Sequence, residues 1–101
     1  MCKNIYKSLI SDFQFLRDYG YNYVYTLKHF VFPSVMFSDD ITEIVIGFSY
    51  ENHRFFVNFY EKQEQWLPKE LLSGISLPGK TYKEQLNTVQ EVLEKFLIRN
   101  R

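Results

Sequence analysis

The sequence predicts an α+β fold in which an antiparallel β-sheet has an N-terminal and a C-terminal helix packed on one face. Apolar residues recur every three or four positions near both ends of the chain, as in amphipathic helices. Between Ile41 and Lys62 they alternate with polar residues, which indicates a β-hairpin. The 101 residues suffice for a single domain, residues 1–101, that buries a core without disulfides or metals.

The first helix is expected from about Asn4 to Tyr19. Its apolar stripe consists of Ile5, Leu9, Phe13 and Leu16, with Ile10 beside it. Gly20 follows and supplies the left-handed residue at which helices commonly end.

From residue 21 to residue 28 the period changes to two, which predicts a strand with Tyr21, Tyr23 and Tyr25 on one face. Pro33 interrupts the strand pattern, because proline cannot donate a hydrogen bond to a neighbouring strand. A short strand over residues 35–37 and a turn over residues 38–40 then lead into the hairpin.

The hairpin register follows from placing Asn52 and His53 at the tip, where asparagine tolerates a left-handed backbone. The expected pairs are Glu51–Arg54, Tyr50–Phe55, Phe48–Val57, Ile46–Phe59 and Glu43–Lys62. The face beneath the helices then carries Ile44, Ile46, Phe48, Phe55, Val57 and Phe59. The face expected to stay open to solvent or to a partner carries Val45, Gly47, Ser49, Phe56, Asn58 and Tyr60.

Beyond Lys62 the pattern weakens, and Pro68 is expected to open a short helical turn that reaches Leu72. The residues expected to pack this segment onto the core are Trp66, Leu67, Leu71, Ile75 and Leu77.

Thr81, followed three positions later by Glu84, forms a capping box and predicts the start of the last helix. The apolar stripe of this helix is Tyr82, Leu86, Val89, Leu93, Phe96 and Leu97.

The charge balance and the cysteine count exclude several classes of protein. Twelve basic and twelve acidic residues give a formal net charge of zero, which argues against direct nucleic-acid binding. No apolar run has the length of a membrane span and no signal-peptide pattern is present, so we expect a cytoplasmic protein. The one cysteine, Cys2, has no partner for an internal disulfide.

No pattern in the chain indicates catalysis, a cofactor or a metal. His29 and His53 lack the ligand spacing of a metal site, and Cys2 lies too close to the terminus for an activated nucleophile. Residues 79–81, Gly-Lys-Thr, resemble the end of a phosphate-binding loop but lack its first glycine. We therefore expect a protein that is not an enzyme and that binds another protein.

Acidic residues form the first set of candidate partner-binding residues. Between His29 and His53 the chain has no lysine or arginine and four acidic residues: Asp39, Asp40, Glu43 and Glu51. One interpretation is a solvated rim that protects strand edges and aids solubility. The other is an acidic patch that steers a basic partner.

Aromatic residues form the second set: Tyr23 and Tyr25 on the first strand, and Phe56 and Tyr60 on the open hairpin face. Half-buried packing is one explanation for such tyrosines. A recognition surface is another, because tyrosine buries a large area at low entropic cost.

Three segments within residues 12–62 resemble small bacterial immunity proteins of contact-dependent growth inhibition and polymorphic-toxin systems: DFQFLRDYGYN, VMFSDD and TEIVIGFSYENHRFFVNFYE. The resemblance implies a cytosolic, non-enzymatic protein that binds the C-terminal toxin domain of a cognate toxin, often a nuclease, and occludes its active site. Many inhibitors of nucleases are clearly acidic, whereas this chain is neutral overall and has only a local acidic stretch.

The alternative function is a small non-enzymatic regulator or adaptor that self-associates through its sheet, since an open aromatic face and free strand edges permit this. A third alternative, an enzyme of another type, requires a deep pocket with perturbed titratable groups. A toxin-domain gene directly upstream favours the immunity protein, and a concentration-dependent dimer without such a neighbour favours the adaptor. The sequence leaves the oligomeric state open.

Overall fold

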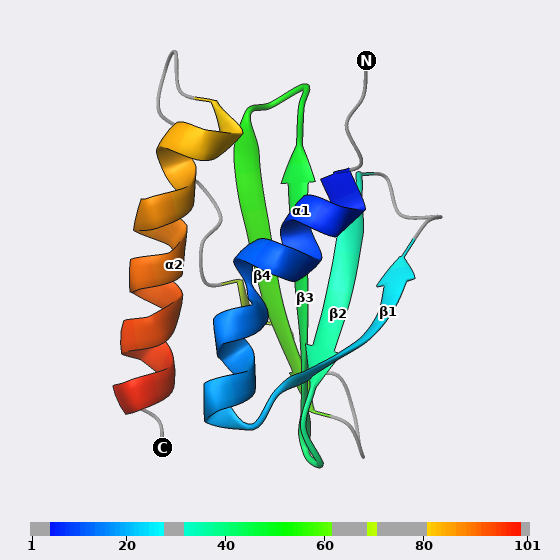
Figure 1. The fold of residues 1–101 in the computed structure, drawn as a ribbon, viewed down its shortest axis with the longest axis vertical. Coiled ribbons are helices and arrows are strands. Elements are labelled where there is room, and N and C mark those ends of the chain that lie inside the picture. Colours follow the sequence, from blue (N-terminus) through cyan, green and yellow to red (C-terminus); the bar gives the residue numbers. More distant parts are fainter. Residues whose placement is uncertain (1–4, 28–31, 62–68, 71–80, 100–101) are drawn as a thin grey trace.

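The computed structural model of the protein describes residues 5–27, 32–61, 69–70 and 81–99. Its elements are α1 (Ile5–Asp12), the 3₁₀ helix η1 (Gln14–Tyr19), β1 (Asn22–Leu27), β2 (Ser34–Ser38), β3 (Thr42–Ser49), β4 (Arg54–Glu61), β5 (Lys69–Glu70) and α2 (Tyr82–Arg99). The strands form one antiparallel sheet in the order β1-β2-β3-β4-β5. Figure 1 shows α1, η1 and α2 on the same face of this sheet, which confirms the predicted α+β fold.

The core lies between the helices and one face of the sheet, which we call the helix-covered face. The sheet contributes the buried side chains of Val35, Phe37, Ile44, Ile46, Phe48, Phe55, Val57 and Phe59. The helices contribute Leu9, Phe13, Leu16, Val89, Leu93 and Leu97. Because side chains alternate along a strand, every second residue of β3 and β4 reaches this face, and the predicted buried face of the hairpin is confirmed.

The N-terminal helical segment is not one continuous α-helix. At Phe13 the α-helical geometry of α1 gives way to the 3₁₀ geometry of η1. Three residues per turn in η1 align Phe13, Leu16 and Tyr19 toward the core. The segment ends as predicted at Gly20, which has a left-handed φ of 93°, and the N–H of Tyr21 donates to the Leu16 carbonyl at 3.0 Å.

A β-bulge in β1 overturns the predicted alternation of the tyrosines. Tyr23 pairs with Phe37, whereas Tyr25 pairs with Met36, so Val24 is the extra residue. The bulge sends Tyr23 to the helix-covered face and Tyr25 to the opposite face. The prediction that the three tyrosines share one face is therefore wrong for Tyr25, because the bulge interrupts alternation along the strand, whereas Tyr21 and Tyr23 both lie on the helix-covered side.

The β3–β4 hairpin is shifted by two residues from the predicted register. A two-residue turn of the predicted kind needs a left-handed backbone at both Asn52 and His53. Only His53, with a φ of 51°, has a positive φ among the described non-glycine residues, and residues 50–53 form a four-residue turn. A shift of two leaves strand side chains on their predicted faces, but Tyr50 now lies in the turn and is 57% exposed. The observed pairs are Ser49–Arg54, Phe48–Phe55, Ile46–Val57 and Ile44–Phe59.

Lys69 and Glu70 form the short strand β5, which pairs with Phe59 and Asn58 of β4. These two residues were predicted to lie in a helical turn, so the prediction is wrong for them. Pairing with β4 prevails because it gives partners to backbone groups on the outer side of that strand. The other predictions for this segment lie outside the described residues, namely those for Trp66, Leu67, Pro68, Leu71, Leu72, Ile75 and Leu77.

α2 begins with the predicted capping box. The Thr81 N–H donates to Glu84 Oε1 at 3.0 Å, and the Glu84 N–H donates to Thr81 Oγ1 at 3.3 Å. Asp12 at the end of α1 receives two hydrogen bonds from α2: Tyr82 donates its hydroxyl to Oδ2 at 2.8 Å, and Gln90 Nε2 donates to the carbonyl at 2.7 Å. Polar contacts therefore fix α2 against α1. None of the described helices is long and apolar enough to cross a membrane.

Candidate protein-binding surface

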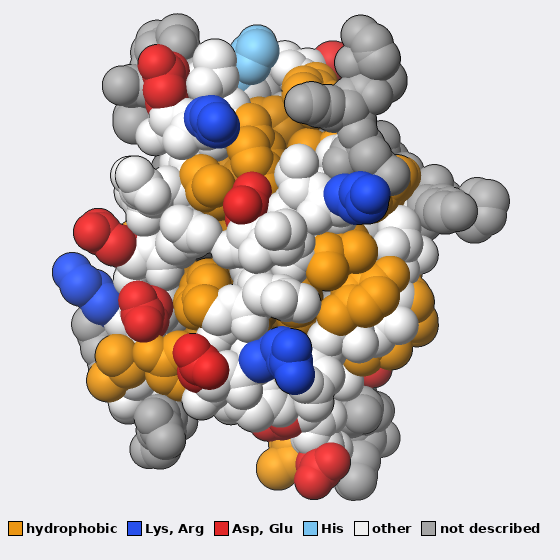
Figure 2. Space-filling view, in the orientation of Figure 1, with side chains coloured by type: hydrophobic (Ala, Val, Ile, Leu, Met, Phe, Trp, Pro, Cys, Tyr) orange, Lys and Arg blue, Asp and Glu red, His pale blue; other side chains and the backbone are white. Residues whose placement is uncertain are grey.

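β1 is an edge strand with an exposed apolar run. Tyr23, Val24 and Tyr25 expose 40%, 44% and 49% of their surface, and no residue of β1 carries a charge. Figure 2, in which the helices face the viewer, shows hydrophobic side chains gathered on the side of the molecule where β1 lies. Proteins usually protect such an edge with charges, proline or a covering segment, because its outer backbone groups can pair with another chain. This uncharged, apolar edge is therefore a candidate binding surface.

The β2–β3 turn brings two of the predicted acidic residues to the start of β1. The pairing of Asn22 with Ser38 holds the turn at this end of the strand. A hollow of about 370 Å³ is lined there by Gly20, Asn22, Val24, Ser38, Asp39 and Asp40. Ile41, in the same turn, is 60% exposed. We call the following residues the β1 edge surface: Tyr23, Val24, Tyr25, Asp39, Asp40 and Ile41.

Asp39 has a structural role in the turn in addition to its charge. Its Oδ1 accepts hydrogen bonds from the N–H groups of Ile41 and Thr42 at 2.8 Å and 2.7 Å. Burial raises the pKa of the Tyr21 hydroxyl, and the negative charge of Asp39 raises it further. Asp40 is exposed, so its charge is directed to solvent. Asp39 therefore stabilises the turn through hydrogen bonds, whereas Asp40 contributes only a negative charge.

Glu43 and Tyr60 lie on the sheet face opposite the helices, where they are cross-strand partners in β3 and β4. Glu43 also pairs with Ser38, so this pair lies toward the end of the sheet that carries the β2–β3 turn. Phe56 lies further along β4, and Phe32 stacks on its ring with 4.4 Å between the centroids. The Phe56 ring is thus partly covered by the protein itself.

Glu51 is the predicted acidic residue that lies far from the others. It belongs to the β3–β4 turn, so the full length of β3 separates it from Asp39 and Asp40. Eight residues of extended strand span about 25 Å. The structure therefore divides the predicted acidic stretch: it brings Asp39 and Asp40 beside Val24 at the start of β1, and places Glu51 at the opposite end of β3.

Two members of the β1 edge surface escape prediction from the sequence. Val24 occupies one of the alternate positions that the strand pattern otherwise gives to polar residues. No local signal in the sequence identifies the bulge that exposes it. Ile41 has a usable signal in the sequence. It is a large apolar residue directly after two aspartates, and such a polar context indicates an exposed position.

Within the described ranges, no three His, Cys, Asp or Glu side chains gather closely enough to hold a metal ion. Comparisons with protein-family models, with curated proteins and with solved structures give no significant match to this chain.

Proposed function

We propose that this chain is an immunity protein that binds the C-terminal domain of a cognate bacterial toxin and neutralises it by occluding its active site. The observation that carries the proposal is the β1 edge surface, where an exposed run of Tyr23, Val24 and Tyr25 adjoins the acidic turn. The proposed protein acts without catalysis of its own and in the cytoplasm.

The chemistry of the β1 edge surface suits a basic protein partner. Tyrosines provide rigid, amphipathic contact area at low entropic cost. Asp39 and Asp40 supply two negative charges at the rim, where charge steers association more than it tightens the final complex. A toxin domain that acts on nucleic acid needs basic groups around its active site to bind phosphates, so it complements this rim.

The test begins with the gene directly upstream of the one that encodes this chain. The C-terminal domain of its product is expressed with and without this protein, and growth and binding kinetics are measured. We expect co-expression to restore growth and the two purified proteins to associate. An upstream product with no toxic domain, or no association between the two proteins, contradicts the proposal.

The structure determines which charge variants test the interface. Asp39→Asn removes the charge but keeps the Oδ1 acceptor that the turn needs, and Asp40→Lys reverses an exposed charge. We expect the double variant to slow association by roughly threefold to tenfold at low salt and to reduce its salt dependence. Glu51→Lys, at the far end of β3, makes the same change in charge as Asp40→Lys alone and is its matched control, and we expect it to leave the on-rate unchanged. If the double variant and Glu51→Lys change the on-rate equally, the interface lies elsewhere.

Self-association through the sheet is the second candidate function, favoured by the position of β1 as an edge strand without charges. Sedimentation velocity over a range of protein concentrations tests it. A concentration-dependent dimer that Val24→Lys abolishes, together with no binding to the upstream product, favours the adaptor over the immunity protein.

A further inference from the structure

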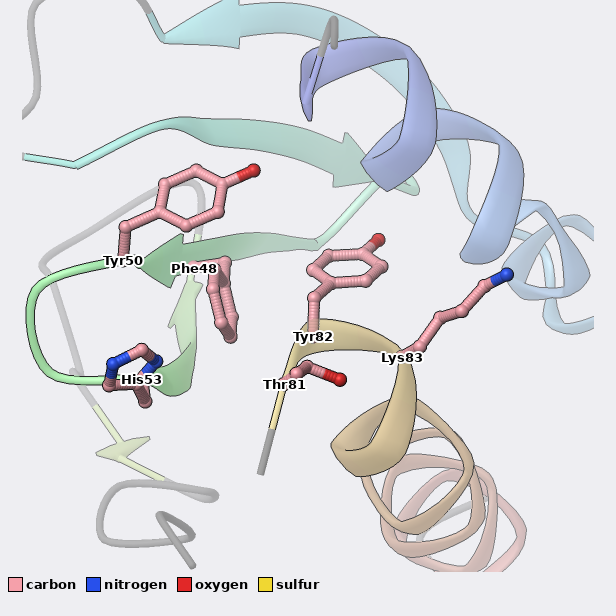
Figure 3. Close-up of a pocket in the computed structure, with 6 residues that line it drawn as sticks. All are labelled: Phe48, Tyr50, His53, Thr81, Tyr82 and Lys83. Carbon is pink, nitrogen blue, oxygen red and sulfur yellow. The ribbon is translucent and has the colours of Figure 1, made fainter. Parts of the chain in front are cut away.

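A pocket of about 380 Å³ opens between the β3–β4 turn and the first turn of α2, at the end of the sheet away from the β2–β3 turn (Figure 3). Its lining residues are Phe48, Tyr50, His53, Thr81, Tyr82 and Lys83. Pockets for small molecules typically have volumes of roughly 300–1,000 Å³ and mainly apolar walls with a few polar groups. This pocket is therefore large enough for a compact molecule with one or two rings.

Three aromatic rings form one side of the pocket. The Phe48 ring meets the Tyr50 ring at 84° with 5.3 Å between centroids, and the Tyr82 ring at 75° with 5.2 Å. Figure 3 shows Tyr50 and Tyr82 on either side of Phe48, with their hydroxyl groups extended in the same direction. A planar aromatic ligand can make offset or edge-to-face contacts with these rings, which are the arrangements that aromatic pairs prefer.

Hydrogen bonds hold the two sides of the pocket in place. Gln85 is only 1% exposed, and its Nε2 donates to the His53 carbonyl at 2.7 Å, which fixes the β3–β4 turn to α2. Within the turn, the Asn52 N–H donates to Ser49 Oγ at 3.2 Å. A pocket fixed in this way is formed before a ligand arrives, so little conformational entropy is lost on binding.

A hydrogen bond holds Tyr82 in addition to its packing. Its hydroxyl donates to Asp12 Oδ2 at 2.8 Å. Burial raises the pKa of Tyr82 strongly, and the hydrogen bond and the charge of Asp12 raise it further. The hydroxyl therefore stays protonated at physiological pH, and this wall of the pocket stays neutral.

The charges of the lining residues themselves favour an anionic ligand. None of the six is acidic, whereas Lys83 is positively charged. The first turn of α2 adds the partial positive charge of a helix N-terminus. Glu84 offsets part of this charge, with its Oε1 bound to the Thr81 N–H. Figure 3 shows the Lys83 side chain extended away from Phe48, Tyr50 and His53. It forms no ion pair with any residue that the structure describes, so a rotation of its flexible stem can bring the ammonium group to a ligand.

We propose that this pocket binds a small planar aromatic carboxylate, with the ring against Tyr50 and Tyr82 above the buried Phe48 and the carboxylate toward Lys83. The site lies at the end of β3 remote from the acidic turn, so it neither requires nor contradicts the binding of a toxin at the β1 edge surface.

The test uses naphthalene-2-carboxylate as the probe, titrated into the full chain and followed by two-dimensional NMR. Two analogues of the same ring, naphthalene-2-methanol and 2-naphthylmethylammonium, separate the contribution of the ring from that of the charge. We expect saturable shift changes confined to the pocket residues, with the carboxylate bound most tightly and the ammonium compound least tightly. Absence of saturation, or tighter binding of the ammonium compound, overturns the proposal.

Three variants locate the site. Tyr50→Ala removes an exposed wall and is expected to raise the Kd of the probe about tenfold. Lys83→Gln is expected to raise the Kd of the carboxylate about threefold and to leave that of the alcohol unchanged. Ile98→Ala, at an apolar residue of α2 with the same 57% exposure as Tyr50, is the control. Equal losses in Tyr50→Ala and Ile98→Ala, or equal effects of Lys83→Gln on both compounds, refute the assigned site.

Discussion

The two turns at the ends of β3 are built in different ways. The β3–β4 turn is fixed to the rest of the protein: the buried Gln85 binds the His53 carbonyl, and the Tyr50 ring packs edge-on against Phe48. The β2–β3 turn is fixed mainly by itself, through the two hydrogen bonds that Asp39 Oδ1 accepts from its own turn. Ile41 beside it stays exposed.

If the proposed function is correct, stability and recognition depend on opposite ends of β3. Side chains at the β3–β4 end contact both the sheet and α2, so their removal affects the folded state. Exposed side chains at the β2–β3 end contact little of the protein, so we expect their removal to change the free energy of unfolding little and to affect the proposed partner instead. Four variants, ordered from the largest expected change in stability to the smallest, test whether the separation holds.

Phe48→Ala is expected to lower the free energy of unfolding by about 3–5 kcal/mol, the range for truncating a buried phenylalanine. The ring is 1% exposed and contacts Tyr50, Phe55 and Tyr82, so its loss leaves a cavity at the β3–β4 end. Urea denaturation measures the change. A loss below about 1 kcal/mol contradicts the core position of this ring.

Gln85→Leu is expected to lower the free energy of unfolding by about 1–3 kcal/mol, because the His53 carbonyl loses its donor. Asn87→Leu, at an exposed position of the same helix, is the control and is expected to change stability by less than about 0.5 kcal/mol. Equal results for the two variants would show that the β3–β4 turn does not depend on this hydrogen bond.

Thr81→Ala is expected to lower the free energy of unfolding by about 0.5–2 kcal/mol, since it removes the acceptor for the Glu84 N–H. Thr88→Ala changes an exposed threonine inside α2 and is expected to be neutral or slightly stabilising, because alanine has the higher helix propensity. Thermal unfolding followed by circular dichroism distinguishes the two. A Thr81 variant as stable as the Thr88 variant excludes an energetic role for the cap.

Asp40→Lys is expected to change the free energy of unfolding by less than about 0.5 kcal/mol, since the side chain is exposed and no ion pair is lost within the described residues. The same variant is expected to slow association with the proposed partner. A large loss of stability would contradict the separation of the two ends.

The sequence predicts the layers of this fold well, because they follow from periodicity. Alternation along the hairpin and the helical stripes identify the buried residues, and the capping box at Thr81 is confirmed by both of its hydrogen bonds. Gly20 is likewise confirmed as the end of the first helical segment. These signals are local and each has one dominant physical cause.

The candidate surface is predicted less well, because it depends on contacts between distant residues. The bulge at Val24 changes which face Tyr25 occupies, and a bulge has no reliable sequence signal. The acidic stretch looks continuous in sequence, but β3 carries Glu51 away from Asp39 and Asp40. Proximity in an antiparallel sheet follows pairing rather than order along the chain, so a run of like charges need not form a patch.

Gln85 also favours one strand register of the β3–β4 hairpin over another. A two-residue shift of β4 along β3 keeps every strand side chain on its own face, so burial alone does not choose between the two registers. Such a shift moves the His53 carbonyl by about 6.6 Å, the rise of two residues, and leaves the buried Gln85 amide without it. Loss of that partner costs about 1–3 kcal/mol, which corresponds to a preference of about 5-fold to 150-fold for the observed register. One buried amide side chain thus selects between two hairpins that hydrophobic patterning treats as equivalent.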